Sequence, residues 1–390
     1  MKTLVENGGI PRSVLFTMAT LAGLTVANMY YNQPLLEMMH RDLRITMVQA
    51  NMITVITQVG YACGLFFVIP AGDLYNRRRI TVFCMSVAAV MLLCITFTGS
   101  IHLIWAASFL LGVCSVVPQI FMPIAAQFSK PENKSRNMGI LLSGLLCGIL
   151  GSRVVSGFIG EWLGWQAMFG FAALVMLVCM AVTLLILPQM KRNFTGSYPK
   201  LMSSVVKILT THATIRLFAV RSAFGFGSLL ALWSCLAFHL VAAPFHAGSD
   251  KVGLLGLCGL ASALACTGIG KYLPRYGYHR FSLIGSALQL AGWAVAFFFG
   301  ESYLGLVAAI VLVDVGVQYH QLTGQSGSIA QMPEAASRVS AIFMTIFFIG
   351  GSLGTFLAGL GWNHAGWDGV SIVGFAMAAV ALLITVVSRK

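Results

Sequence analysis

The amino-acid sequence predicts an all-α polytopic membrane protein, with 12 transmembrane helices in two parallel six-helix repeats. Composition, long apolar runs and an internal repeat lead to this prediction. Hydrophobic residues make up 58% of the 390 residues and charged residues only 9%, whereas about 25% of a soluble domain is charged. This composition excludes a soluble enzyme, a disordered chain and a nucleic-acid-binding domain, although the net charge is +13.

Apolar runs long enough to cross a bilayer follow one another along the chain, separated mostly by short polar breaks. A transmembrane helix needs about 20 apolar residues. The runs also lack the period-two alternation of membrane-spanning β-strands. The predicted spans are residues 13–36, 47–70, 80–98, 103–127, 138–160, 167–187, 214–242, 252–270, 281–299, 304–330, 339–361 and 370–387.

The longest break falls in the middle of the chain and defines its organisation. It separates an N-terminal six-helix bundle, residues 1–187, from a C-terminal six-helix bundle, residues 214–390, and leaves a cytoplasmic linker at 188–213. Basic and apolar residues between 200 and 209 predict a short helix lying on the membrane surface.

Basic residues are distributed unevenly between the loops. If both termini are cytoplasmic, most of the 24 Lys and Arg residues fall in cytoplasmic loops, and the opposite loops hold only Arg41, Arg44 and Lys251. Cytoplasmic loops of membrane proteins carry such an excess. We therefore expect a multi-pass protein with both termini in the cytoplasm, whose basic residues contact lipid headgroups rather than nucleic acid.

The two halves of the chain resemble each other. Residues 130–136, Lys-Pro-Glu-Asn-Lys-Ser-Arg, align with residues 332–338, Met-Pro-Glu-Ala-Ala-Ser-Arg, and the same offset aligns Gly148 with Gly350. A unit of six spans is therefore repeated in the same orientation. Parallel repeats of this kind pack around a central binding site in secondary transporters.

The fifth predicted span is rich in glycine. Gly144, Gly148 and Gly151 lie on one side of the helix, so a neighbouring helix can approach the backbone closely. We expect this side to pack and slide against another span.

The loop between the second and third spans carries a family resemblance. Residues 70–79 read Pro-Ala-Gly-Asp-Leu-Tyr-Asn-Arg-Arg-Arg. The aspartate and the closing arginines resemble the signature loop of the major facilitator superfamily, G-x-x-x-D-R-x-G-R-R. Residues 28–36, 153–157 and 343–351 are similar to bacterial inner-membrane transporters of the drug/proton antiporter type.

The resemblance implies the major facilitator fold, a place in the bacterial inner (plasma) membrane and a cytoplasmic gate. A pair between the aspartate of the loop and an arginine would form in one state and break in the other. Alternatively, the arginines only anchor the loop at the membrane surface. The gate residues that the resemblance implies are Gly72, Asp73, Arg77, Arg78 and Arg79.

Four ionisable side chains stand out inside the spans. Charge there costs roughly 3 kcal/mol or more, which makes each such residue a candidate for function. Asp314, the only carboxylate deep inside a span, and His320 are the proton-coupling candidates. Arg153 would bind an anionic group or pair with a titrating one. The alternatives are a permanent ion pair for Asp314, a structural role for Arg153 and hydrogen-bonded packing for His320. We expect Arg221 to extend to the cytoplasmic interface.

Amide, phenol and indole groups in the spans predict a polar cavity. In the tenth span, Asp314, Gln318 and Gln321 or Gln325 recur at helical spacing and form a polar stripe. The tyrosines of the first span could equally belong to an interfacial aromatic belt. The substrate-cavity candidates are Asn28, Tyr31, Asn32, Gln58, Tyr61, Gln119, Arg153, Trp233, Gln318, Gln321 and Gln325.

These features favour a secondary active transporter that moves a small organic molecule or metabolite by alternating access, with proton-coupled efflux as the first hypothesis. The alternative is a proton symporter or facilitator for uptake of a polar or anionic solute, and a remote alternative is a non-transporting membrane sensor. The sequence contains no recognisable catalytic, cofactor or metal motif, so we expect no enzyme activity, cofactor or metal. The expected partners are the substrate, protons and membrane lipid, without nucleic acid, and the expected working unit is a monomer.

Overall fold

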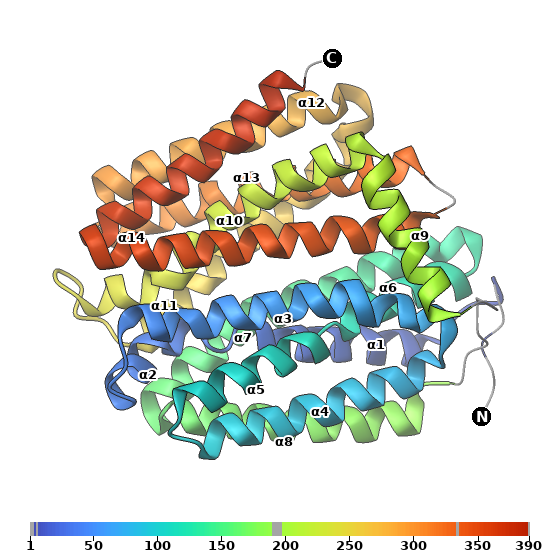
Figure 1. The fold of residues 1–390 in the computed structure, drawn as a ribbon, viewed down its shortest axis with the longest axis horizontal. Helices are drawn as coiled ribbons and strands as arrows, with labels where there is room; N and C mark the ends of the chain where they lie inside the picture. Colours follow the sequence, from blue (N-terminus) through green and yellow to red (C-terminus); the bar gives the residue numbers. More distant parts are fainter. Residues whose placement is uncertain (1–3, 5–6, 189–196, 333–334, 389–390) are drawn as a thin grey trace.

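The computed structural model describes residue 4 and residues 7–188, 197–332 and 335–388. For residues 73, 126, 135, 262–272, 274, 275 and 337 it describes the backbone alone. Helices and the turns between them make up the described chain (Figure 1).

The first half of the chain folds into the lower part of the view in Figure 1. Its elements are α1 (Arg12–Val26), η1 (Ala27–Met29), η2 (Gln33–Leu35), α2 (Leu36–Asp42), α3 (Met47–Leu74), α4 (Arg77–Phe97), α5 (Ile101–Cys114), α6 (Val117–Phe128), η3 (Pro131–Asn133), α7 (Lys134–Leu163) and α8 (Trp165–Ile186).

The second half begins with a crossing helix and fills the upper part of the view. Its elements are α9 (Tyr198–Thr211), α10 (Ala213–Val241), α11 (Ser249–Leu255), η4 (Gly256–Cys258), α12 (Gly259–Phe299), α13 (Tyr303–Gln331) and α14 (Ala336–Val387).

Two long helices each extend over more than one predicted span: α14 contains the last two, and α12 contains 281–299 and the end of 252–270, which begins in α11 and η4. α12 leaves helical geometry at Gly277, where φ is 78°, and α14 does so at Ala365 and Gly366. Over the described residues, ten stretches are long and apolar enough to span a bilayer, and one of them, Arg338–Val387, includes the bend of α14. The predicted all-α polytopic fold is confirmed.

Local sequence explains where several helices begin and end. Thr46 and Gln49 form a capping box at the start of α3, with N–O distances of 2.8 and 3.1 Å. The Asn76 side chain accepts a hydrogen bond from the Arg78 N–H at the start of α4, at 3.0 Å. Pro34 stands at the first turn of η2, where no backbone donor is needed. The first span therefore continues beyond its predicted end at residue 36 to Asp42.

The internal repeat has a counterpart in the backbone. Gly164, between α7 and α8, has φ of 86°, and Gly366, at the bend of α14, has φ of 55°. Both values lie in the left-handed region that glycine adopts without strain. Each glycine separates the last two spans of its half, at the same offset as the sequence repeat.

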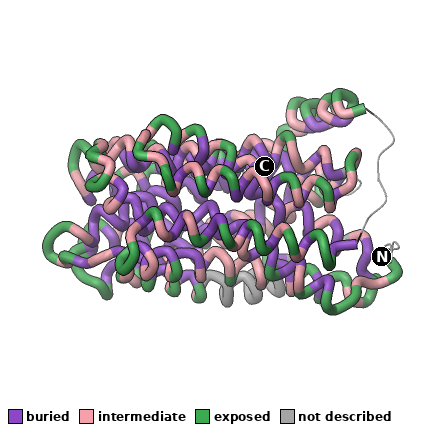
Figure 2. The backbone as a smooth tube through the Cα atoms, turned by 90° about the horizontal axis from the view of Figure 1, so that it is seen from below, coloured by how far each residue is buried: buried purple, intermediate pink, exposed green. Residues whose placement is uncertain are grey.

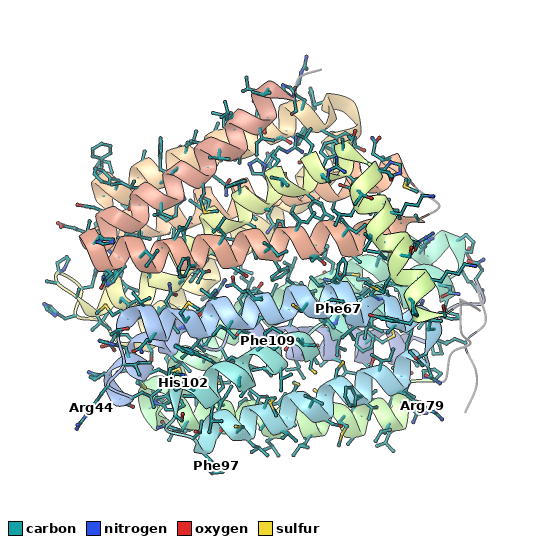
Figure 3. All side chains as sticks on the ribbon, viewed as in Figure 1. Arg44, Phe67, Arg79, Phe97, His102 and Phe109 are labelled. Atoms are coloured by element: carbon teal, nitrogen blue, oxygen red, sulfur yellow. The ribbon has the colours of Figure 1, made fainter. Side chains whose placement is uncertain are left out.

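The helices run between two ends of the molecule. The distal end is formed by α2, residues 43–46 and α11, and the proximal end by residues 7–11, η3 and α9 (Figure 1). Figure 3 shows Arg44 at the distal end and Arg79 at the proximal end. α9 contains the predicted linker helix and buries Leu201 and Val205.

The outer surface of the bundle is apolar. Phe97 is 84% exposed and Leu304 is 81% exposed, and Figure 3 shows Phe97 pointing away from the helices. Buried residues line the interior in Figure 2, and exposed ones follow the outside of the helices. A soluble monomer rarely exposes so much apolar surface, so this surface fits contact with lipid.

α1 and α7 approach each other at glycines. A Cβ on Gly148 would lie 2.1 Å from the Gly23 carbonyl oxygen, and one on Gly144 would lie 2.3 Å from that of Ala19. Gly151, predicted to share this packing side, instead has no atom within 4 Å of such a Cβ. Close backbone packing at small residues stabilises helix pairs in membranes through van der Waals contacts.

We therefore predict that Gly148→Ala destabilises the protein, because neither backbone can move away from the added methyl group. Overpacking of this kind costs about 1–3 kcal/mol. The measurement is the Tm of the purified protein in detergent. Gly151→Ala in the same helix is the matched control and should keep the wild-type Tm; equal Tm values for the two variants would contradict the packing described here.

Candidate functional site

Arg153 of α7 lies buried between the two halves of the chain and is 4% exposed. Its Nε donates a hydrogen bond of 2.9 Å to Oε1 of Gln33. Its guanidinium lies 3.8 Å from the ring centroid of Trp233 on α10 and 5.1 Å from that of Tyr30. Amide and aromatic groups from both halves thus stabilise this cation.

Asp314 of α13 is the acidic partner of this cluster and is 5% exposed. Arg153 and Asp314 attract each other electrostatically, yet the structure describes no ion pair between them. The Trp233 indole lies beside both groups. Trp233 is close enough to influence Asp314, but its Nε1–H forms no hydrogen bond with the residues that the structure describes. The permanent ion pair considered as an alternative for Asp314 is therefore not formed in this conformation.

Glycines at every third position bring the second half close to Arg153. A Cβ on Gly253 would lie 2.5 Å from the Arg153 carbonyl oxygen, and one on Gly256 would lie 3.0 Å from the Arg153 Cβ. A Cβ on Gly259 would stand 3.7 Å from Oδ2 of Asp314. Side chains at these positions would separate α11 and η4 from α7, so the glycines set the width of the site.

The end of the first span contributes polar atoms to the same region. Asn28 and Asn32 are buried, and Nδ2 of Asn28 lies 3.3 Å from the Met176 sulfur. Oδ1 of both asparagines and Nε2 of Gln33 are buried without a hydrogen-bond partner among the described residues. Buried polar atoms are normally satisfied, so the two oxygens can accept, and the nitrogen can donate, a hydrogen bond to a water or a bound solute. Tyr31 is also buried, and its carbonyl accepts a hydrogen bond from Ser156 on α7.

A second contact between the halves joins α3 to α14. Nε2 of Gln58 lies 3.3 Å from Oγ1 of Thr355. The rings of Tyr61 and Phe348 lie 4.4 Å apart. Gln119 of α6 stands beside the Tyr61 hydroxyl as a hydrogen-bonding neighbour. These three cavity candidates thus lie together, on α3 and α6.

The polar residues of α13 separate into two environments. Gln318, Gln321 and Gln325 are half-buried, and Nε2 of Gln325 donates to Oγ of Ser340 at 3.0 Å. His320 is fully buried, and its Nε2 lies 3.2 Å from Oγ of Ser286 on α12. The structure therefore places His320 inside the second half and does not bring it together with Arg153 and Asp314.

Arg221 of α10 does not extend to the interface, so that expectation is wrong. It is 2% exposed, and its guanidinium lies 5.0 Å from the ring centroid of Phe218. Its Nε and Nη2 find no hydrogen-bond partner in the part of the chain that the structure describes. From Arg221 onward nearly every side chain of α10 is buried, whereas Leu217 and Val220 just before it are exposed.

The signature loop lies at the proximal end. Nε of Arg77 donates to the Gly72 carbonyl at 3.1 Å, and Nη1 lies 3.3 Å from Oε1 of Gln127 on α6. Arg78 donates to the Leu184 carbonyl on α8, and Arg79 is exposed. The side chain of Asp73 lies outside the described residues.

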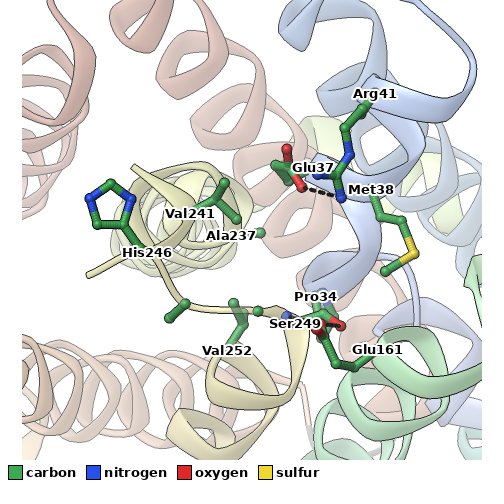
Figure 4. Close-up of a pocket in the computed structure, with 12 residues that line it drawn as sticks. Pro34, Glu37, Met38, Arg41, Glu161, Ala237, Val241, His246, Ser249 and Val252 are labelled. Carbon is green, nitrogen blue, oxygen red and sulfur yellow. Dashed lines mark hydrogen bonds and ion pairs between the residues drawn. The ribbon is translucent and has the colours of Figure 1, made fainter. Parts of the chain in front are cut away.

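A cavity of about 270 Å³ opens at the distal end between the two halves (Figure 4). Below it, Oε2 of Glu161 accepts hydrogen bonds from the Ser249 N–H at 2.9 Å and from the Ser249 hydroxyl at 3.2 Å. The same hydroxyl lies 2.9 Å from the Gly157 carbonyl oxygen. These contacts join α7 to α11, and Glu161 and Ser249 both line the cavity. Glu161 gives no signal in the sequence, because it stands just beyond the end of the predicted span 138–160.

Known proteins are similar to this chain in sequence and in fold. The sequence profile of the Major Facilitator Superfamily matches residues 17–355. The uncharacterized transporter YgaY of Escherichia coli O157:H7 is 34% identical over 378 residues, which cover 97% of this chain and 96% of YgaY. The probable transporter SCO4007 of Streptomyces coelicolor is 29% identical over 370 residues, which cover 94% of this chain and 85% of that protein.

A solved structure of a mutant of the nucleoside transporter NupG has the same fold, with a TM-score of 0.79 at 14% identity. The superposition covers 97% of this chain and 100% of the NupG chain. Since the family profile extends from the first predicted span to the eleventh, and YgaY matches almost end to end, this chain belongs to the major facilitator superfamily and is a membrane transporter rather than an enzyme.

Proposed function

We propose that the protein is a proton-coupled secondary transporter for a small polar or anionic organic solute, and that Arg153 and Asp314 form its coupling site. The observation that carries this proposal is the buried cluster of Arg153, Trp233 and Asp314, in which opposite charges face each other without an ion pair. Arg153 can receive an anionic group of the solute, and Asp314 can receive a proton.

Alternating access supplies the transport cycle in this proposal. The halves 1–187 and 214–390 rock against each other around the site, and residues 188–213 connect them. The Glu161–Ser249 contact is the distal gate, and the loop of Gly72 to Arg79 is the proximal one. Contacts between the halves below the distal cavity support a conformation closed at the distal end.

The distribution of basic residues supports the orientation. The proximal end carries Arg79 and Lys130, and we assign it to the cytoplasm, with both termini, in the bacterial inner membrane. Lipid then surrounds the apolar outer surface. The charged and aromatic groups of the coupling site come from one chain, so we propose a monomer as the working unit.

Efflux in exchange for protons is the direction that the sequence resemblance favours. The charges of the site favour the second candidate, uptake together with protons, if the solute is anionic. An anion held at Arg153 repels the Asp314 carboxylate, so the anion and a proton bind together. A neutral polar solute brings no such charge. The sign of the proton gradient that drives transport in vesicles distinguishes efflux from uptake.

We predict that Asp314→Asn abolishes proton-coupled transport and leaves counterflow, because asparagine cannot exchange a proton but keeps the shape of the site. A thermal-shift screen of organic acids, nucleosides and dipeptides first supplies the solute. Proteoliposomes with an imposed pH gradient then provide the measurement. Asp368→Asn, the same change at an exposed position, is the control. Unchanged coupled transport in Asp314→Asn would refute the role of this residue.

Arg153→Gln should weaken binding of an anionic solute at least about tenfold, because a charge-assisted hydrogen bond to a bound anion contributes about 1.5–3 kcal/mol. The measurement is the solute concentration that gives half of the maximal Tm shift. Arg216→Gln at the proximal end serves as the control. If both variants keep wild-type affinity, Arg153 does not contact the solute.

Glu161→Ala should open the distal end, since it removes the acceptor for two hydrogen bonds from Ser249. Spin labels at Arg44→Cys and Lys251→Cys, in a background without the native cysteines, report the distance between the halves. We expect a larger fraction of long distances. Glu37→Ala is the control, because Glu37 lines the same cavity but pairs with Arg41 of its own helix at 3.7 Å. A shift of equal size in both variants would contradict the gate.

A further inference from the structure

A second pocket, of about 220 Å³, lies at the proximal end, away from the site between the halves. It is built entirely by the first half, where residues 9–16 meet η3 and the start of α7. Three cationic side chains line it: Arg12, Lys130 and Arg136. Transport through the coupling site uses none of them, so the pocket needs a separate explanation.

The chain ahead of α1 is held in place as one wall of this pocket. The Asn7 N–H donates to the Gln127 carbonyl at 3.2 Å, and the Gly9 N–H donates to the Phe128 carbonyl at 2.9 Å. Gly9 has φ of 99°, a conformation that favours glycine. The Lys130 side chain packs over Gly9, with its Cγ 3.4 Å from the position of a Cβ. Backbone hydrogen bonds thus fix the wall.

The pocket is positively charged and offers free donors. Among the residues that the structure describes, no carboxylate lines it and none of the three cations forms an ion pair. Glu132, the acid of η3, is exposed and is not among the residues that line the pocket. Asn137, 9% exposed, adds an amide, whose Nδ2 lies 2.8 Å from Oγ of Ser129. The N-terminus of α7 further favours an anion here.

The other side of the same pocket is apolar and lies on the outer surface of the bundle. Phe16, one turn deeper along α1 than Arg12, lines the pocket and is 58% exposed. Ile140, one turn deeper along α7 than Arg136, lines it from the other helix. Cations at the rim with exposed apolar groups below them match a molecule that has a charged head and an acyl chain. A free phosphate ion would gain nothing from Phe16.

We propose that this pocket binds the phosphate group of an anionic phospholipid from the adjacent leaflet. Arg12, Lys130 and Arg136 hold the phosphate, and Phe16 and Ile140 contact the first methylene groups of the acyl chains. Arg12 belongs to α1 and Arg136 to α7, so the lipid bridges the two helices that pack at Gly23 and Gly148. Juxtamembrane basic residues attract anionic lipid in this way.

Native mass spectrometry of the purified, detergent-solubilised protein tests the proposal, with phosphatidylglycerol as the anionic probe and phosphatidylcholine as the zwitterionic one. The wild type should retain phosphatidylglycerol preferentially. Arg12→Gln combined with Arg136→Gln should weaken this binding by about tenfold, since each basic residue contributes to lipid attraction. Lys200→Gln combined with Lys207→Gln removes the same charge from exposed positions of α9, and should weaken binding far less, because these two residues do not line the pocket.

Three results would overturn the proposal. The first is equal retention of both lipids by the wild type, and the second is equal loss of phosphatidylglycerol in the two double variants. The third is displacement of phosphatidylglycerol by millimolar inorganic phosphate, which would make the site one for the free ion. If the Arg12 and Arg136 double variant does not fold, Lys130→Gln provides the same comparison, because its side chain is exposed.

Discussion

The buried charge of Arg153 is the constraint on which the rest of this site depends. A cation at membrane depth is costly, and here its described neighbours are Gln33, Tyr30 and Trp233 rather than a carboxylate in contact. Asp314 attracts it across Trp233. Among the described side chains, the Arg153 guanidinium therefore has no anion in contact with it. A bound solute or a movement of Asp314 can supply one. A closed ion pair would be stable and inert, whereas this arrangement can respond to a bound solute.

The surrounding backbone is shaped to keep that cluster narrow. Gly253, Gly256 and Gly259 bring the second half against α7, and Gly148 brings α1 against its other side. α7 is therefore packed tightly against α1 of its own half and against α11 and η4 of the second half. The same helix extends from the proximal pocket at Arg136 to the distal contact at Glu161. A displacement of α7 would therefore move residues of the coupling site and of both ends together.

The sequence alone predicts the spans well, because the thickness of a bilayer dictates the length of each apolar run. It also singles out Arg153 and Asp314, because the cost of burying charge makes each exceptional. It does not predict their neighbours: Gln33 and Trp233 are distant in sequence from Arg153 and meet it only when the halves pack. The burial of Arg221 is likewise unpredictable from the sequence, because only the packing of the helices shows that this part of α10 is enclosed. Glu161 cannot be recognised from the sequence, because an acidic residue near the end of a span is typical of a loop.

The most direct test of the coupling between Arg153 and Asp314 is the number of protons exchanged when the solute binds. Calorimetric titration in buffers of different ionisation enthalpy measures this number for the wild-type protein without any gradient or transport. Coupling between the two residues predicts exchange of about one proton per bound solute, because binding at Arg153 changes the charge that Asp314 experiences. Binding heats that are the same in every buffer would mean that no proton is exchanged, and would contradict it.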